Sequence, residues 1–188
     1  YLGRSYAGEV HVRMGVQATQ RQEFESGILH VVRAANLNPQ ESRYPLVLAQ
    51  LQFQHAIRES QKESTDKRVV GQLVSAAVRN ARHTTELAPN SAAAWQALGD
   101  MYVQVIPVAG EAVQWAQDAY THAIALEPTN PVLYVGRGSV YRVDKKKKEA
   151  REDYDYAVQL KGDYAQAHAA LAGFLEEEKD LDAAIASQ

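Results

Sequence analysis

The side chains that could catalyse proton transfer or bind metal ions are spread along the whole sequence. Carboxylates cluster at Glu152-Asp153 and from Glu176 to Glu178, and paired carboxylates do acid-base chemistry where a cleft holds them against a substrate. The histidines are His11, His30, His55, His83, His122 and His168. No two of them have the close spacing of a metal-binding motif, and the sequence lacks H-E-x-x-H, P-loop and G-x-G-x-x-G motifs. We therefore expect no catalysis, no cofactor and no metal site, with the acidic clusters on solvated helix faces.

A run of four lysines, Lys145 to Lys148, is the sequence feature that could bind phosphate groups. Acidic residues flank it at Asp144 and Glu149, and the chain carries a net charge of -3. A surface that binds nucleic acid is instead basic over a wide area. We expect a solvated turn of mixed charge and no nucleic-acid partner, with lipid or nucleic-acid binding as the alternative.

The composition describes an ordinary globular chain of 188 residues, 46% of them hydrophobic. Its most apolar segment, Met101 to Gly110, is interrupted by Gln104 and Pro107, and it falls short of the roughly 20 residues that span a bilayer. We expect no direct membrane insertion. Cysteine is absent, which excludes disulfides and thiolate ligands but leaves the cellular compartment open.

One short segment predicts how the chain is built. Trp95, Leu98, Gly99 and Tyr102 fall on one side of a helix because they follow the i, i+3, i+4, i+7 pattern. A glycine inside a helix costs roughly 0.5–1 kcal/mol relative to alanine, so Gly99 indicates that another backbone approaches closely. The segment therefore predicts an amphipathic helix with a closely packed partner helix.

The same pattern returns along the chain. Tyr134, Gly138 and Tyr141 repeat it, and further sets follow the first helices: Ala116, Tyr120 and Ala123, then Ala150, Tyr154 and Ala157. From Pro131 to Ala165 the period is 34 residues. This arrangement resembles the tetratricopeptide repeat (TPR), with Arg137 in place of the usual leucine and Gly162 in place of the closing proline. The resemblance implies an all-α fold, a right-handed α-solenoid of TPR-like helix pairs.

The resemblance also divides the chain. We expect a single TPR array fragment, residues 1–188, with approximate repeats 1–41, 42–91, 92–130, 131–164 and a truncated 165–188. Leu2-Gly3 and Tyr6 are expected in the middle of the first helix. Helix breaks are expected near Pro39, Arg58 to Asp66, Pro89, Val105 to Gly110, Pro128, Asp144 and Gly162.

In proteins with this repeat the first helices line a concave groove, which implies a binding site here. The partner-binding positions in this sequence are Phe53, Gln96, Asp100, Val103, Val135, Ser139 and Arg142. Gln50 and Gln54 also fall in groove positions of the same repeat as Phe53. The clamp of basic and amide residues that binds C-terminal carboxylates in one subclass is absent, since its slots hold Gln96, Asp100, Gly136, Gln166 and Ala170. The expected function is a protein-interaction or scaffold module that binds a peptide or partner helix.

An alternative function stays open. The chain is also similar to the TPR tails of bacterial O-antigen-ligase-like membrane proteins, through closures such as Glu86-Leu87-Ala88-Pro89-Asn90. That similarity implies a non-catalytic appendage of a larger bacterial enzyme or membrane protein involved in cell-envelope polysaccharide assembly.

Two glycines lead to opposite expectations about stability. Gly99 occupies the slot that faces the second helix of its own pair, so Gly99→Leu should overpack that contact. Gly136 is expected on the groove side, where Gly136→Ala should be stabilising through helix propensity.

Overall fold

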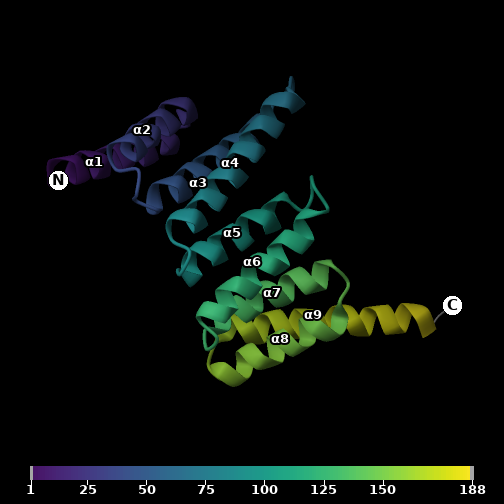
Figure 1. The fold of residues 1–188 in the computed structure, drawn as a ribbon. Helices are drawn as coiled ribbons and strands as arrows, with labels where there is room; N and C mark the ends of the chain where they lie inside the picture. The colour runs from purple at the N-terminus through teal and green to yellow at the C-terminus, as the bar shows by residue number, and fades with distance from the viewer. Residues whose placement is uncertain (1, 187–188) are drawn as a thin grey trace. The chain divides into compact units, whose positions relative to one another are not determined.

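The protein is described from a computed structural model, which covers the backbone of residues 2–186 and the side chains of residues 3–179. The secondary structure of this part of the chain consists of α-helices joined by turns, without a strand (Figure 1). Its helices are α1 (Leu2–Gln20), α2 (Phe24–Leu37), α3 (Arg43–Ser60), α4 (Lys67–Leu87), α5 (Ala92–Val105), α6 (Ala112–Leu126), α7 (Pro131–Val143), α8 (Lys147–Leu160) and α9 (Ala165–Ala186). The fold class is therefore the expected one, an all-α chain of helix pairs.

Several helix boundaries follow from local chemistry. Asn130 is the N-cap of α7, because its side chain accepts a hydrogen bond from the Val132 backbone N–H at 3.1 Å. Pro131 then occupies the first helical position, where its missing N–H costs nothing. Asp66 caps α4 in the same way through the Arg68 N–H at 2.9 Å. The break expected from Arg58 to Asp66 is shorter than predicted, since α3 continues to Ser60.

Close contacts between Cα atoms divide the chain into two compact units, Tyr1–Met101 (unit 1) and Tyr102–Gln188 (unit 2). One core cluster of unit 1 consists of buried residues from α2 and α3: Val31, Ala34, Tyr44, Leu48 and Leu51. The Tyr44 hydroxyl also donates a hydrogen bond to Glu9 Oε1 at 3.0 Å, which ties α3 to α1. Arg43 forms an ion pair with the same carboxylate, and this interaction lowers the pKa of Glu9.

Within unit 1, α1 and α2 approach each other closely at two glycines. A Cβ built on Gly15 would lie 2.8 Å from the Gly27 carbonyl oxygen, and one on Gly27 would lie 2.8 Å from the Gly15 carbonyl oxygen. Leu2-Gly3 and Tyr6, which were expected in the middle of this helix, do not make that contact, since Gly3 has no neighbour within 4 Å and Tyr6 is 74% exposed. The Leu2 side chain lies outside the described residues.

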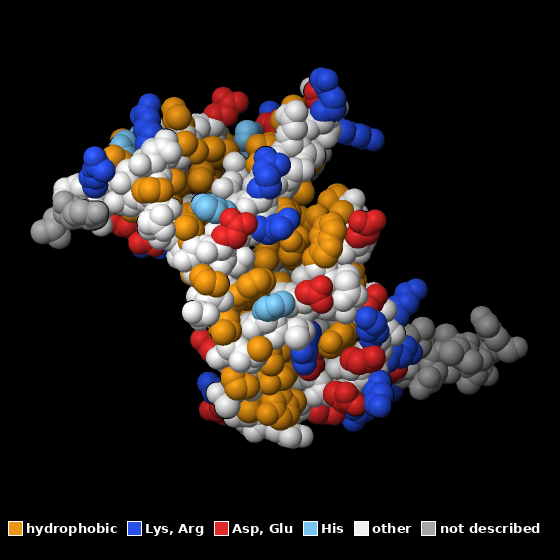
Figure 2. All heavy atoms as spheres, in the orientation of Figure 1, with side chains coloured by type: hydrophobic (Ala, Val, Ile, Leu, Met, Phe, Trp, Pro, Cys, Tyr) orange, Lys and Arg blue, Asp and Glu red, His pale blue; other side chains and the backbone are white. Residues whose placement is uncertain are grey.

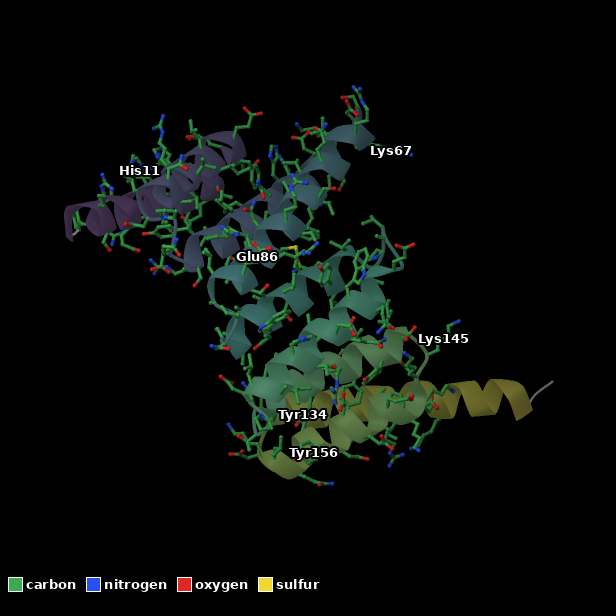
Figure 3. The ribbon with its side chains drawn as sticks, viewed as in Figure 1. His11, Lys67, Glu86, Tyr134, Lys145 and Tyr156 are labelled. Atoms are coloured by element: carbon green, nitrogen blue, oxygen red, sulfur yellow. The ribbon has the colours of Figure 1, made fainter. Side chains whose placement is uncertain are left out.

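A core cluster of unit 2 joins α7, α8 and α9 through Tyr134, Val135, Ala150, Tyr154, Ala157, Ala167 and Phe174. Gly138 brings α7 close to α8, since a Cβ there would lie 2.8 Å from the Tyr154 ring and 3.2 Å from the Ala150 carbonyl oxygen. This is the contact that the motif predicts for its glycine. The rings of Tyr134 and Tyr156 pack edge to face, with their centroids 4.7 Å apart (Figure 3).

The expectation for Gly136 is wrong. A Cβ at this position would lie 2.7 Å from Tyr120 Cζ and 3.0 Å from the Tyr120 hydroxyl. Tyr120 is itself 4% exposed, so Gly136 faces α6 and not an open surface. The sequence offered no direct sign of this, because position 136 lies outside the repeat motif.

Candidate protein-binding groove

The expected groove residues of unit 1 lie on α3 and α5. Phe53 and Gln96 are half-buried, and Asp100 is exposed. A large side chain that is half-buried on a helix leaves part of its apolar surface available to a partner. The assignment of these three residues to partner binding stays a prediction.

The expected groove residues of unit 2 are largely engaged within the unit. Val135 is 6% exposed and belongs to the core. Ser139 donates to the Val135 carbonyl at 2.9 Å and accepts a hydrogen bond from the Tyr154 hydroxyl at 3.2 Å. Arg142 pairs with Glu177 on α9 at 2.9 Å, while Val103 is half-buried. Val135 therefore acts in packing, and only an exchange of hydrogen bonds would free Ser139 or Arg142.

A pocket of about 300 Å³ lies in unit 1 between α1, the start of α2 and α3. We call it the α1–α3 pocket. Its lining combines apolar side chains with glutamines and one threonine: Val16, Thr19, Gln20, Phe24, Val47, Gln50, Leu51 and Gln54. The three glutamines are exposed. The pocket therefore offers apolar contact surrounded by amide donors and acceptors, without a charged residue in its lining.

A second pocket of unit 1, of about 460 Å³, shares Phe24 with the first. Phe24 stacks on His55 with ring centroids 5.1 Å apart. In the lining of this pocket, Glu59 forms an ion pair with Lys62 at 2.6 Å and lies 3.1 Å from His55 Nε2. The hydrogen bond from Lys62 is the main cause of the lowered pKa of Glu59. This pocket is consequently a network of mixed charge.

The sequence predicts that the acidic cluster at Glu152-Asp153 is solvated, but this is only partly correct. Asp153 is 6% exposed, and both of its carboxylate oxygens accept hydrogen bonds from Arg137, each at 2.8 Å. These bonds raise the pKa of Arg137 despite its burial. Arg137, which replaces the leucine of the motif, and the buried Asp153 therefore form one ion pair. The sequence pattern alone did not predict that these two residues interact.

The lysine run forms a turn of mixed charge. Lys146 pairs with Asp144 at 2.8 Å, Lys147 with Glu178 at 3.0 Å, and Lys148 lies 3.8 Å from Glu152. Figure 2 shows basic and acidic side chains interspersed over this part of unit 2. The arrangement is a set of surface ion pairs and not an open basic patch.

The described side chains contain no group of three or more histidines or carboxylates that could hold a metal ion. Likewise, none of the described helices is both long and apolar enough to cross a membrane.

Comparisons with known proteins identify the fold. No family model matches the sequence, and no curated protein matches it. The structure is similar to TTC0263, a thermophilic TPR protein in Thermus thermophilus, with a TM-score of 0.66 and 22% identity over 96% of this chain and 87% of that chain. It is also similar to MamA, with a TM-score of 0.65 and 19% identity over 95% of this chain and 86% of that one.

A further similar structure is MamA 41-end from Desulfovibrio magneticus RS-1, with a TM-score of 0.65 and 14% identity over 95% of this chain and 89% of that one. Identities this low show the fold alone. The chain therefore has the α-solenoid fold of TPR proteins. The comparisons give no support to the similarity with O-antigen-ligase-like tails.

Sequence reasoning identified part of the α1–α3 pocket and missed the rest. Gln50 and Gln54 fall one turn before and one residue after Phe53, on the face of α3 that the repeat register assigns to the groove. The α1 side, with Val16, Thr19 and Gln20, was missed because the register of the first repeat was placed too early. The glycine that packs on α2, Gly15, would have corrected the register.

Proposed function

We propose that this protein is a protein-interaction module that binds a peptide or partner helix on the face formed by the first helices of its pairs. The observation that carries the proposal is the α1–α3 pocket, whose lining combines apolar side chains with exposed glutamines. Both helices are first helices of their pairs, the elements that line the groove in the TPR resemblance. The pocket suits one apolar side chain whose neighbouring peptide groups bond to glutamines.

The groove predicted from the sequence extends this surface. Phe53 and Gln96, both half-buried, and the exposed Asp100 are its further candidates in unit 1. We leave Val135 out of the proposed surface because it is buried in the core of unit 2.

A peptide display experiment tests the proposal. Random peptides are selected on the full chain and then measured against two variants, Val16→Glu and Val69→Glu. The two valines are matched in exposure, at 37% and 38%, but only Val16 lines the pocket. Val16→Glu should weaken the selected peptides at least about tenfold, because a carboxylate in an apolar pocket opposes apolar side chains. Val69→Glu should leave them unchanged.

The proposal is wrong if the peptides bind the Val16→Glu variant as tightly as the unchanged chain, or if Val69→Glu weakens them equally. Circular dichroism of both variants establishes that helix content is preserved.

A further inference from the structure

Two histidines that are far apart in sequence meet on neighbouring helices of unit 1. His11 lies on α1 and His30 on α2, and their Nδ1 atoms are 3.2 Å apart. The ring centroids are separated by 5.4 Å with an angle of 32° between the planes. Both side chains are half-buried. Figure 3 labels His11 on α1.

We propose that this histidine pair is a two-donor site for a late first-row divalent cation, with zinc as the ion used to test it. A tetrahedral zinc ion with Zn–N bonds of about 2.0–2.1 Å holds two ligand nitrogens about 3.3–3.4 Å apart. A 90° angle at a square-planar ion gives about 2.9 Å. The observed separation of the Nδ1 atoms lies between these values, so a single ion could bridge both nitrogens after small ring rotations.

The helix backbones hold the two donors in place. His11 precedes Gly15 by four residues on α1, and His30 follows Gly27 by three on α2. The mutual approach of Gly15 and Gly27 fixes the distance between the two helices at this level. A Cβ on Gly15 would lie 3.5 Å from His30 Cβ, so His30 stands directly against α1. Donors carried by rigid helices lose little freedom when they bind an ion.

Imidazole is the donor that suits zinc, copper and nickel, whereas magnesium prefers oxygen. With two protein donors the remaining coordination positions are filled by water, and the ion's affinity is correspondingly modest. The competing explanation is a hydrogen bond between two neutral imidazoles, in which one nitrogen donates and the other accepts.

Zinc titration of the full chain, free of any added histidine tag, distinguishes the two explanations. The imidazole nitrogens are followed by ¹⁵N NMR in the unchanged protein and in His11→Gln, His30→Gln and His83→Gln variants. His83 serves as the control outside the pair, because its imidazole is exposed on α4 and bonds to Glu86 at 3.0 Å. Zinc should shift the His11 and His30 Nδ1 signals together and before those of other histidines, and magnesium should shift neither.

Substitution of either member of the pair should weaken zinc binding at least about tenfold, since even loss of an outer-sphere partner costs that much. The His83→Gln variant should bind as the unchanged protein does. The proposal is overturned if zinc shifts neither signal, or if it shifts His83 or another histidine at the same concentration. The titration of the unchanged protein decides the question even if a substitution at position 11 or 30 disturbs folding.

Discussion

Two helical glycines, one in each unit, show how a side-chain contact can reverse an expectation from helix propensity. Gly136 looks like a helix residue that alanine would improve, yet Tyr120 occupies the space that a methyl group would need. Gly71 on α4 is the opposite case, since a Cβ there would have no neighbour within 4 Å. A glycine-to-alanine substitution at these two positions therefore measures the effect of packing separately from the effect of helix propensity.

We predict that Gly136→Ala destabilises unit 2 and Gly71→Ala stabilises unit 1. Overpacking costs typically about 1–3 kcal/mol, which exceeds the gain of up to about 1 kcal/mol from helix propensity at Gly136. At Gly71 only the propensity gain remains. Urea denaturation of the two variants measures both signs, and a stabilised Gly136→Ala variant would show that Tyr120 moves away freely.

The pairing of Arg137 with Asp153 leads to a second prediction at this scale. The two side chains are only 18% and 8% exposed, and loss of one partner leaves the other charge buried alone. Asp153→Ala should therefore cost about 3–5 kcal/mol, whereas replacing both residues by leucine should cost far less or be neutral.

Urea denaturation of the Asp153→Ala and Arg137→Leu/Asp153→Leu variants provides the measurement. Glu152→Ala is the control, since Glu152 is exposed and should change the free energy of unfolding by less than about 0.5 kcal/mol. Equal losses for the single and double variants would contradict the argument.

At the scale of elements, the TPR motif predicted the helix pairs well because it states the contacts that pairs require. Gly138 meets Tyr154 and Ala150 as the motif implies, and the helix breaks at Pro39, Pro89 and Pro128 follow from proline and capping chemistry. The register of α1 failed because Leu2-Gly3 and Tyr6 imitate the motif locally. Only contacts between distant residues, such as Gly15 with Gly27, distinguish the true register, and a local pattern does not contain them.

The turn between α7 and α8 contains a residue in the left-handed region. Lys145 has φ of 60°, a conformation that costs a residue with a side chain about 1–2 kcal/mol. Lys145→Gly should therefore stabilise unit 2 by up to about 1 kcal/mol, after the greater freedom of glycine in the unfolded chain is deducted.

Thermal unfolding compares this variant with Lys145→Ala, which removes the same charge without relieving the backbone. A Lys145→Ala variant as stable as Lys145→Gly would assign the effect to charge. The position of Lys145 at the turn is seen in Figure 3.

At the scale of the whole chain, a repeat protein transmits stability only between neighbouring helix pairs. Tyr44 is 1% exposed in the core of unit 1, so Tyr44→Ala should cost about 3–5 kcal/mol locally. Amide hydrogen exchange should accelerate in α1 to α3 and remain nearly unchanged in α7 and α8. Equal acceleration in both regions would show that the chain unfolds as a single cooperative body.

The buried ion pair of α7 and α8 has a consequence for folding. A chain of similar helices can join the wrong neighbours, because many of their apolar faces are interchangeable. If α7 packed on a helix without Asp153, the Arg137 guanidinium would enter an apolar contact with no carboxylate to neutralise it. We therefore expect the Arg137–Asp153 pair to favour α8 over a helix without such a carboxylate as the partner of α7, a role in folding specificity that leucine, the usual residue of the motif, could not have.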